Sequence, residues 1–424
     1  MTEKIYNEML DEYLYKHVHK SGLTVYCVPK KGHTKSYAAF ATKYGSLINE
    51  FKVEGDNEIT KIPDGVAHFL EHKLFEQPDG TDAFVKYSKT GANANAYTGF
   101  NNTVYLYSCT DLFYENLEIL LEFVSNPYFT EQNIAKEQGI IGQEIRMYDD
   151  DPNWRVYFNM LDAMYVNFPI KRDIAGTVES IAHINKDILY KCYNTFYNPQ
   201  NMILFVCGDV VMDEVLKLCD KYVIHKEIGD VKCYFPNEPQ EVFKHETVQK
   251  LSVSKPLFAI GFKDNDIGFD GEELLKKEMV TSILLEMILG EGSQLYNKLY
   301  DEGLINDSFG TEYEGEPNYG FSCILGESEN PRMVLSEILN SFKSLKLSEK
   351  EFERAKRVEY GSFLRLWNSV EGISNTMVSD LFKNINIFDF PRIFSSISFD
   401  DVTKRFENHF KTDNYVISII EPIE

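Results

Sequence analysis

The sequence lacks long hydrophobic runs and any closely spaced pair of cysteines. Its longest apolar stretch, Met202 to Cys207, is far too short to span a bilayer. The first residues, Met1 to Glu8, contain no basic region followed by an apolar one, so we expect no secretory signal. The seven cysteines are scattered and never form a Cys-x-x-Cys pair, which favours reduced, buried thiols over a disulfide framework or a cysteine zinc site. These absences predict a cytoplasmic protein.

Positive charge is scarce as well. Lys and Arg number 43 against 66 Asp and Glu, so the formal net charge is −23. Nucleic acids and anionic membranes bind clustered Lys and Arg, so the sequence argues against both as partners. The acidic excess is explained by solubility, or alternatively by an acidic interior that attracts basic peptides.

Apolar residues are plentiful enough for a folded protein with more than one core. They make up 43% of the 424 residues, a length that predicts two or three domains. In the first half, strands are predicted at 23–28, 36–42, 103–108 and 201–208, and helices from Gly65, over 111–124 and from Thr130 past Glu144. Asp64 is the expected cap of the helix that begins at Gly65.

The second half repeats this order. Strands are predicted at 257–262 and 321–325, and helices at 272–289 and 330–345, the last capped by Asn330. Thr130-Glu131 is echoed by Ser348-Glu349, and Asn201-Met202 by Asn414-Tyr415, at nearly the same separation. We therefore expect an α+β protein of two homologous domains, each a mainly antiparallel β-sheet packed with helices. The predicted ranges are 1–225 and 250–424, joined by a linker over 226–249.

The pentapeptide His68-Phe69-Leu70-Glu71-His72 lies on the first predicted helix. Residues four apart lie one above the other on a helix, so His68 and His72 can bind one metal ion. Glu71 projects beside them, where a general base acting on water would lie. Such a pattern also arises by chance, and a structural protein with a chance motif is the plainest alternative.

A third ligand is expected from the helix that begins near Thr130. Glu137 and Glu144 lie seven residues apart on one face, beside Ile140, Ile141 and Ile145, which turn the helix towards the core. A carboxylate on a buried face is costly unless it is paired or binds a metal. Spacing alone leaves open which of the two is the ligand.

This combination resembles the insulinase/pitrilysin family of zinc peptidases, whose metal motif is inverted to His-x-x-Glu-His. The resemblance implies one zinc ion per chain, bound by His68, His72 and Glu144. It also implies that Glu71 is the general base and that Glu137 supports a His from behind. The segment Gly91 to Thr98 resembles the family's edge strand that pairs with the substrate backbone, which implies peptide contacts from Asn95, Ala96 and Tyr97.

The chain departs from the family in its second half. Active members carry an Arg and, about seven residues later, a Tyr that orient the substrate carbonyl. Here Tyr300 stands in place of the Arg, and Asn306 or Asp307 in place of the Tyr. Tyr44-Gly45-Ser46 and Met147 to Pro152 resemble a bacterial cytosolic subgroup that is encoded beside a homologue lacking the zinc motif.

These features predict a zinc endopeptidase that cleaves unfolded peptides in a closed chamber. We expect it to be the zinc-bearing subunit of a heterodimer in which the motif-lacking partner supplies the missing pair, with a homodimer as the alternative. The competing hypothesis is a catalytically weak scaffold that binds zinc or peptide, which the resemblance to the subgroup links to modification of a translation factor.

Overall fold

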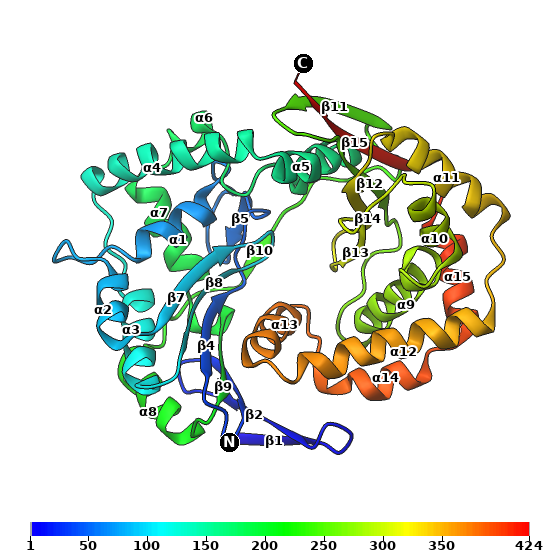
Figure 1. Cartoon of the computed structure of the whole chain (residues 1–424). Coiled ribbons are helices and arrows are strands. Elements are labelled where there is room, and N and C mark those ends of the chain that lie inside the picture. The colour runs from blue at the N-terminus through cyan, green and yellow to red at the C-terminus, as the bar shows by residue number, and fades with distance from the viewer. Residues whose placement is uncertain (1, 424) are drawn as a thin grey trace. The chain divides into compact units, whose positions relative to one another are not determined.

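The computed structural model describes residues 2–423, which form two compact units (Figure 1). Unit 1 comprises the chain up to Ile145 together with Arg172–Phe235 and Leu366–Phe382. Unit 2 comprises Arg146–Lys171, Pro236–Arg365 and the chain from Lys383 onward.

Unit 1 is built on a seven-stranded sheet with the order β1-β2-β3-β9-β4-β8-β7. Its strands are β1 (Thr2–Asn7), β2 (Glu12–Val18), β3 (Thr24–Pro29), β4 (Ser36–Thr42), β7 (Asn93–Thr98), β8 (Thr103–Cys109) and β9 (Met202–Gly208). Only β3 and β9 run parallel; the other neighbours are antiparallel. A small second sheet has the order β10-β5-β6, from β5 (Glu50–Val53), β6 (Thr60–Lys61) and β10 (Val231–Cys233).

The helices of unit 1 are amphipathic and bury their apolar faces. They are α1 (Val66–Leu74), α2 (Ala83–Thr90), α3 (Phe113–Ser125), most of α4 (Glu131–Asp150), α6 (Val178–Ile181), α7 (Lys186–Phe196), η2 (Pro199–Asn201), α8 (Met212–Tyr222) and α13 (Val370–Phe382). The strands β4 and β9 are buried along their whole length, as expected of the centre of a sheet covered on both faces.

Unit 2 is built on a five-stranded sheet with the order β11-β15-β12-β14-β13. Its strands are β11 (Glu246–Leu251), β12 (Leu257–Lys263), β13 (Gly310–Gly315), β14 (Gly320–Glu327) and β15 (Tyr415–Pro422). Its helices are α5 (Pro152–Met164), η1 (Pro169–Lys171), α9 (Gly271–Leu289), α10 (Gln294–Asp301), α11 (Pro331–Ser344), α12 (Glu349–Leu366), η3 (Ile387–Asp389), α14 (Phe390–Ser396) and α15 (Phe399–His409).

The two sheets share one topology. In unit 1 the strands β3-β9-β4-β8-β7 follow the chain in the order first, fifth, second, fourth and third, and the strands of unit 2 follow the same order. In both, the first and last strands pair in parallel and the others antiparallel. The predicted fold, two homologous α+β domains with mainly antiparallel sheets, is confirmed.

Each unit includes one α-helix from the other half of the sequence, and unit 2 also includes the short helix η1. The helix α5 packs on β12 and β15, where a side chain at Gly261 would lie 2.2 Å from the Met164 Cε atom. The helix α13 packs on the equivalent strands β4 and β9 of unit 1, and the Tyr37 hydroxyl donates a 2.7 Å hydrogen bond to Asn375 on it. The compact units therefore differ from the continuous ranges 1–225 and 250–424, and the predicted linker contains the strand β10 and the first four residues of β11.

Two predicted helix caps differ from the structure. The N-cap of α1 is Gly65 and no side chain caps it; Asp64 instead forms a 2.8 Å ion pair with Arg172. Gly65 has a φ of 91°, and a side chain there would lie 2.4 Å from the Ala175 carbonyl oxygen, so both backbone conformation and space favour glycine. Asn330 is the N-cap of α11 as predicted, but its side chain makes no capping hydrogen bond.

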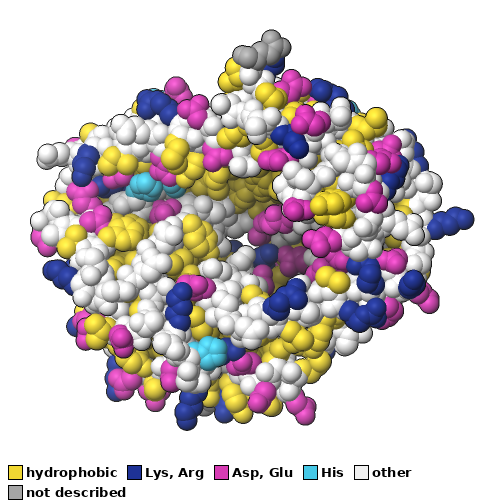
Figure 2. All heavy atoms as spheres, in the orientation of Figure 1, with side chains coloured by type: hydrophobic (Ala, Val, Ile, Leu, Met, Phe, Trp, Pro, Cys, Tyr) yellow, Lys and Arg dark blue, Asp and Glu magenta, His cyan; other side chains and the backbone are white. Residues whose placement is uncertain are grey.

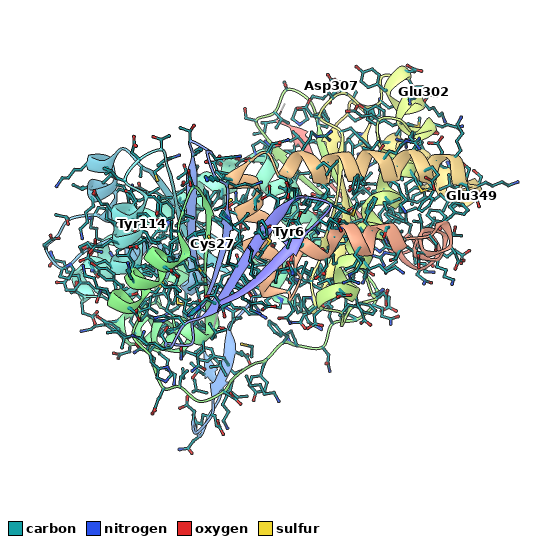
Figure 3. All side chains as sticks on the ribbon, turned by 90° about the horizontal axis from the view of Figure 1, so that it is seen from below. Tyr6, Cys27, Tyr114, Glu302, Asp307 and Glu349 are labelled. Atoms are coloured by element: carbon teal, nitrogen blue, oxygen red, sulfur yellow. The ribbon has the colours of Figure 1, made fainter. Side chains whose placement is uncertain are left out.

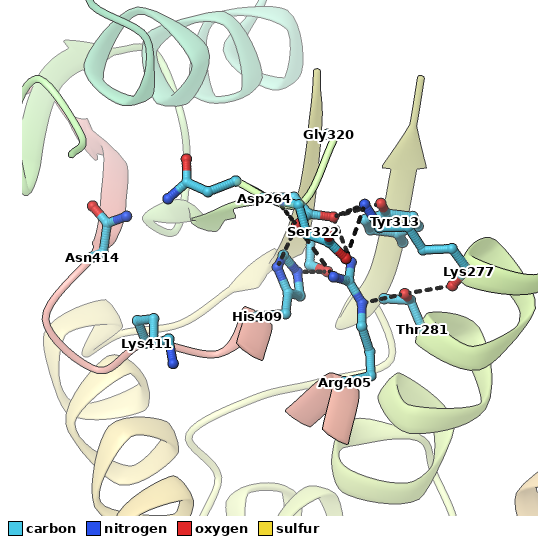
Figure 4. A network of polar contacts seen from close by, with 12 residues as sticks. Asp264, Lys277, Thr281, Tyr313, Gly320, Ser322, Arg405, His409, Lys411 and Asn414 are labelled. Carbon is cyan, nitrogen blue, oxygen red and sulfur yellow. Dashed lines mark hydrogen bonds and ion pairs between the residues drawn. The ribbon is translucent and has the colours of Figure 1, made fainter. Parts of the chain in front are cut away.

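A buried polar network joins the elements of unit 2 (Figure 4). The Asp264 carboxylate, which follows β12, accepts hydrogen bonds from the Arg405 guanidinium at 2.6 Å and the Tyr313 hydroxyl at 2.7 Å. The Lys277 ammonium lies 3.0 Å from the same carboxylate, and His409 shares a 2.7 Å hydrogen bond with the Ser322 hydroxyl. Because the network spans α9, α15, β13 and β14, it fixes these elements around one charged group.

The structure also shows where the cysteines and the charged residues lie, and whether any helix could span a membrane. All seven cysteines are free, and all except Cys233 are buried, including Cys27 on β3 (Figure 3). Figure 2 shows Asp and Glu spread over the visible face with Lys and Arg among them. Within residues 2–423, every helix is too short or too polar to cross a membrane.

Candidate metal centre

The helices α1 and α4 of unit 1 together carry the predicted metal-binding side chains. Val66, Phe69 and Leu70 bury one side of α1, and His68 and His72 are directed towards Glu144 on α4. On α4, Ile141 and Ile145 are buried as predicted. Ile140 is 44% exposed, so its expected place in the core is wrong.

Three donor groups converge between these helices. The His68 Nε2 atom lies 3.6 Å from one Glu144 oxygen, and the His72 Nε2 atom lies 3.3 Å from the other. One ligand atom from each of His68, His72 and Glu144 falls within 4.8 Å of the other two. Two imidazoles and a carboxylate are the donors of a catalytic zinc site, so the set fits such an ion.

Glu137 lies behind His72. Its Oε1 atom is 3.1 Å from the His72 Nδ1 atom, so the ring presents Nε2 towards Glu144. Burial lowers the pKa of His72, but the hydrogen bond to Glu137 and the charges of Glu71 and Glu144 outweigh it, and the pKa is raised. Burial likewise raises the pKa of Glu137, but His72 and Lys73 outweigh it, and the pKa is lowered. Both shifts reflect a tight pairing of the ring with the carboxylate.

Glu71 is held by a residue of the edge strand. The Thr98 hydroxyl, at the end of β7, donates a 2.6 Å hydrogen bond to the Glu71 Oε2 atom. This bond orients the carboxylate that precedes His72 and leaves its other oxygen for a further partner.

The surroundings of His68 are a second observation consistent with a bound cation. The His68 Nδ1 atom is buried and has no hydrogen-bond partner among the described residues, so the ring's polar contact is made on the Nε2 side, towards Glu144. A cation between the His68 Nε2 atom and the Glu144 carboxylate would satisfy both groups.

A pocket of about 320 Å³ borders the centre. Glu71, His72 and Glu137 line it, together with Phe75, Phe84, Ile140 and the strand residues Asn95 and Ala96. The strand β7 is the outermost of its sheet and pairs only with β8. Its Ala96 N–H donates to the Asn95 side chain at 2.9 Å and therefore points away from β8, while Tyr97 is partly exposed.

The residues that replace the family's Arg and Tyr lie in unit 2. Tyr300, on α10, is 47% exposed and stacks on Tyr296. Asn306 donates a 3.1 Å hydrogen bond to Glu327, and Asp307 is exposed in the loop after α10 (Figure 3).

Comparison with known proteins places this fold and centre in one family. The chain belongs to the insulinase family of peptidases, family M16. The insulinase (peptidase family M16) model matches residues 56–178, and the model of the peptidase M16 inactive domain matches residues 183–359.

Three similar proteins cover nearly the whole chain. An uncharacterized zinc protease of Bacillus subtilis strain 168, YmfH, is 41% identical over 428 residues and is matched over 100% of both chains. A crystal structure of an M16-like peptidase from Alicyclobacillus acidocaldarius superposes with a TM-score of 0.93 at 32% identity, covering 97% of this chain and 99% of that one. Zinc protease PqqE of Helicobacter pylori is 24% identical over 97% of this chain and 94% of its own.

Two residues of the centre were not singled out from the sequence. Lys73, next to His72, is fully buried and lies 3.2 Å from Glu137, and Thr98 contacts Glu71. A lysine within a buried helical motif was the available signal for the first. The second depends on how β7 lies against α1, which local pattern does not encode.

Proposed function

We propose that this chain is a zinc-dependent endopeptidase with one zinc ion held by His68, His72 and Glu144. The observation that carries the proposal is the convergence of these three donor groups, with Glu71 directly before His72 on α1. Zinc, when bound, supplies Lewis-acid chemistry that polarises a peptide carbonyl and makes water more acidic.

The side chains of α1 and α4 have separate roles in this proposal. Glu71 accepts the proton of the attacking water and later delivers it to the leaving amine, with Thr98 holding its carboxylate in place. Glu137 keeps the His72 ring in the orientation that presents Nε2. Glu144 completes the ligand set and balances the charge of the metal.

The substrate is proposed to pair with β7 as an added strand. Asn95, Ala96 and Tyr97 lie on this edge, and the Ala96 N–H already points outward, so an extended peptide would replace the Asn95 side chain as its acceptor. In such pairing the affinity comes from hydrogen bonds to the peptide backbone, which suits the cleavage of unfolded peptides of varied sequence.

The replacement of the expected Arg and Tyr in this chain suggests which partner subunit it needs. We propose that the chain is the zinc-bearing subunit of a heterodimer, in which a homologue that lacks the motif supplies the donor pair and the two subunits enclose the peptide in a chamber. Tyr300 and Asn306 at the corresponding positions support this over a homodimer, because a second copy would carry the same replacements. A cytoplasmic location remains a prediction.

The same replacements favour a second candidate, a scaffold that binds zinc or peptide with little turnover. A quenched peptide library, incubated with the zinc-loaded chain alone and with its motif-lacking homologue, separates the two. Cleavage that requires both proteins supports the heterodimeric peptidase, and cleavage by the chain alone supports a peptidase without that partner. No cleavage in either sample, with zinc bound, supports the scaffold and contradicts the peptidase.

A further inference from the structure

Lys73 contacts the rear of the proposed metal centre and belongs neither to the ligand set nor to the His-x-x-Glu-His motif. It follows His72 on α1, its side chain is 0% exposed, and its ammonium lies 3.2 Å from the Glu137 Oε2 atom. A second hydrogen bond joins the ammonium to Glu76, three residues further along the chain and just beyond the end of α1.

The two oxygens of Glu137 therefore have different partners. Oε1 faces the His72 Nδ1 atom at 3.1 Å, and Oε2 faces Lys73. A carboxylate that is held at one oxygen only can rotate about its last bond, and the hydrogen bond to the ring then becomes variable. Held at both oxygens, Glu137 keeps one geometry.

We infer that Lys73 is a positioning residue for zinc, acting through Glu137 to fix the ring of His72. The inference rests on the proposed function, because it assumes that the His72 Nε2 atom binds the metal. It goes beyond that function because it makes the affinity for zinc depend on the pairing of Lys73 with Glu137 as well as on the ligands themselves.

A simple electrostatic view makes the opposite prediction. Lys73 carries a positive charge near the metal, so its removal would relieve like-charge repulsion and tighten zinc binding. Positioning predicts weaker binding. The sign of the change therefore separates the two explanations.

The test uses variants that preserve net charge. Replacing both members of a lysine–glutamate pair by neutral side chains, Lys73→Met with Glu76→Gln, removes the contact to Glu137 while the summed charge stays the same. The matched control is Lys86→Met with Glu122→Gln, which removes another lysine–glutamate pair of unit 1, at 2.7 Å, that does not contact Glu137. Zinc affinity of the full chain is measured by competition with a chelator, and folding of the metal-free chain by circular dichroism.

We expect the Lys73/Glu76 variant to bind zinc about 10- to 100-fold more weakly, the range found for residues behind a metal ligand, and the control to match the wild type. In a chain that already carries Glu137→Gln, the same pair of changes should have little further effect, because the residue through which Lys73 acts has changed. Binding as tight as the wild type or tighter, or an undiminished effect in the Glu137→Gln chain, would overturn the inference.

Glu76→Gln alone keeps the Lys73–Glu137 contact and serves if the double variant does not fold. It should bind zinc like the wild type, and a loss comparable to that of Glu137→Gln would contradict the assignment to Lys73. Peptide cleavage by the wild-type chain is measured separately. A chain that binds zinc but cleaves no peptide, either alone or together with its motif-lacking homologue, refutes the proposed peptidase and leaves the test of Lys73 intact.

Discussion

At the scale of single residues, the centre is built on the contacts of one imidazole with two carboxylates. The His72 Nε2 atom faces Glu144, and its Nδ1 atom faces Glu137. The sequence showed both glutamates on one face of a helix but could not separate their roles. Geometry separates them, because only Glu144 also lies near His68.

The roles of the two glutamates predict different costs for the same substitution. Glu144→Gln removes a proposed ligand and should weaken zinc binding by more than about 100-fold, whereas Glu137→Gln changes a supporting contact and should cost about 10- to 100-fold. Zinc affinities of the two variants, measured by chelator competition, check the order. A larger loss for Glu137→Gln would exchange the assignments.

Thr98 is predicted to contribute to catalysis and not to metal binding. Its hydrogen bond to the Glu71 carboxylate is charge-assisted, and such bonds contribute about 1.5–3 kcal/mol. Thr98→Val should therefore lower kcat about 10- to 100-fold and leave zinc content at the wild-type level, while Thr98→Ser, which keeps the hydroxyl, should stay close to the wild type. A Thr98→Val chain with unchanged kcat would remove Thr98 from the proposed mechanism.

At the scale of helices and strands, local pattern predicted several of the long elements, whereas the helices α5, α7, α8, α13 and α15 were not predicted. The strand β4 and the helices α9 and α11 lie within a residue or so of their predicted ranges, since their apolar periodicity is strong. The short strands β5, β6 and β10 were not predicted. The strand β10 pairs with β5 across a long stretch of chain, and the three short strands bury only Phe51, so little in their local sequence marks them as strands.

The metal motif was predicted for the same local reason, because His68, Glu71 and His72 lie within two turns of one helix. Among the contacts that hold the motif, the support of a His by Glu137 was implied by the family resemblance, and the contact of Thr98 was not predicted. Thr98 and Glu137 approach α1 from β7 and α4, and their distances to it follow from how these elements pack. Residues that act within one helix can be inferred from spacing, and residues that act between elements require the structure.

The buried network of unit 2 predicts a loss of stability in mild acid. Burial, aided by the charge of Arg405, lowers the pKa of His409 to about 3, against 6.5 for an exposed imidazole. Between these values the unfolded chain binds a proton that the folded chain does not, so the free energy of unfolding falls as the pH falls through this window. Asp264 adds to the loss only in stronger acid, where its carboxylate, whose pKa is lowered although burial opposes this, becomes protonated.

From pH 7 to pH 5, His409 should account for a loss of about 2 kcal/mol in the free energy of unfolding. His409→Gln should remove this part of the pH dependence, and His33→Gln, at an exposed site, should leave it in place. Urea unfolding of both variants at the two pH values makes the comparison. An identical pH dependence for His409→Gln and the wild type would show that His409 is not held neutral.

At the scale of the whole molecule, the exchange of α5 and α13 makes each half of the sequence incomplete. Residues 1–225 alone would lack α13, which covers β4 and β9 with Ile373, Met377 and Val378. Residues 250–424 alone would lack both α5 and the edge strand β11. The sequence predicted the duplication of the domain. It did not predict the exchange of α5 and α13, because that exchange depends on contacts between distant segments.

We therefore predict that neither half folds when it is produced alone. Each should show low solubility or broad thermal unfolding, because the sheet face that α13 or α5 covers would expose buried apolar side chains. Co-production of 1–235 with 236–424, which splits the chain where unit 1 passes into unit 2, should restore a complex with the far-ultraviolet circular dichroism of the intact chain. A single half with a cooperative thermal transition would contradict the mutual dependence.

The central claim is that Glu71 acts as a general base beside a zinc ion held by its neighbours. The most direct test is the rate of peptide cleavage by the complex purified from its native host, with either the wild-type chain or Glu71→Gln, and with zinc measured in the same samples. We predict one zinc per chain in both, cleavage by the wild type, and at least a 1,000-fold lower rate for Glu71→Gln, on the order of what removing a general base costs. A zinc-loaded Glu71→Gln complex that cleaves at the wild-type rate, or a zinc-loaded wild-type complex that does not cleave, would contradict it.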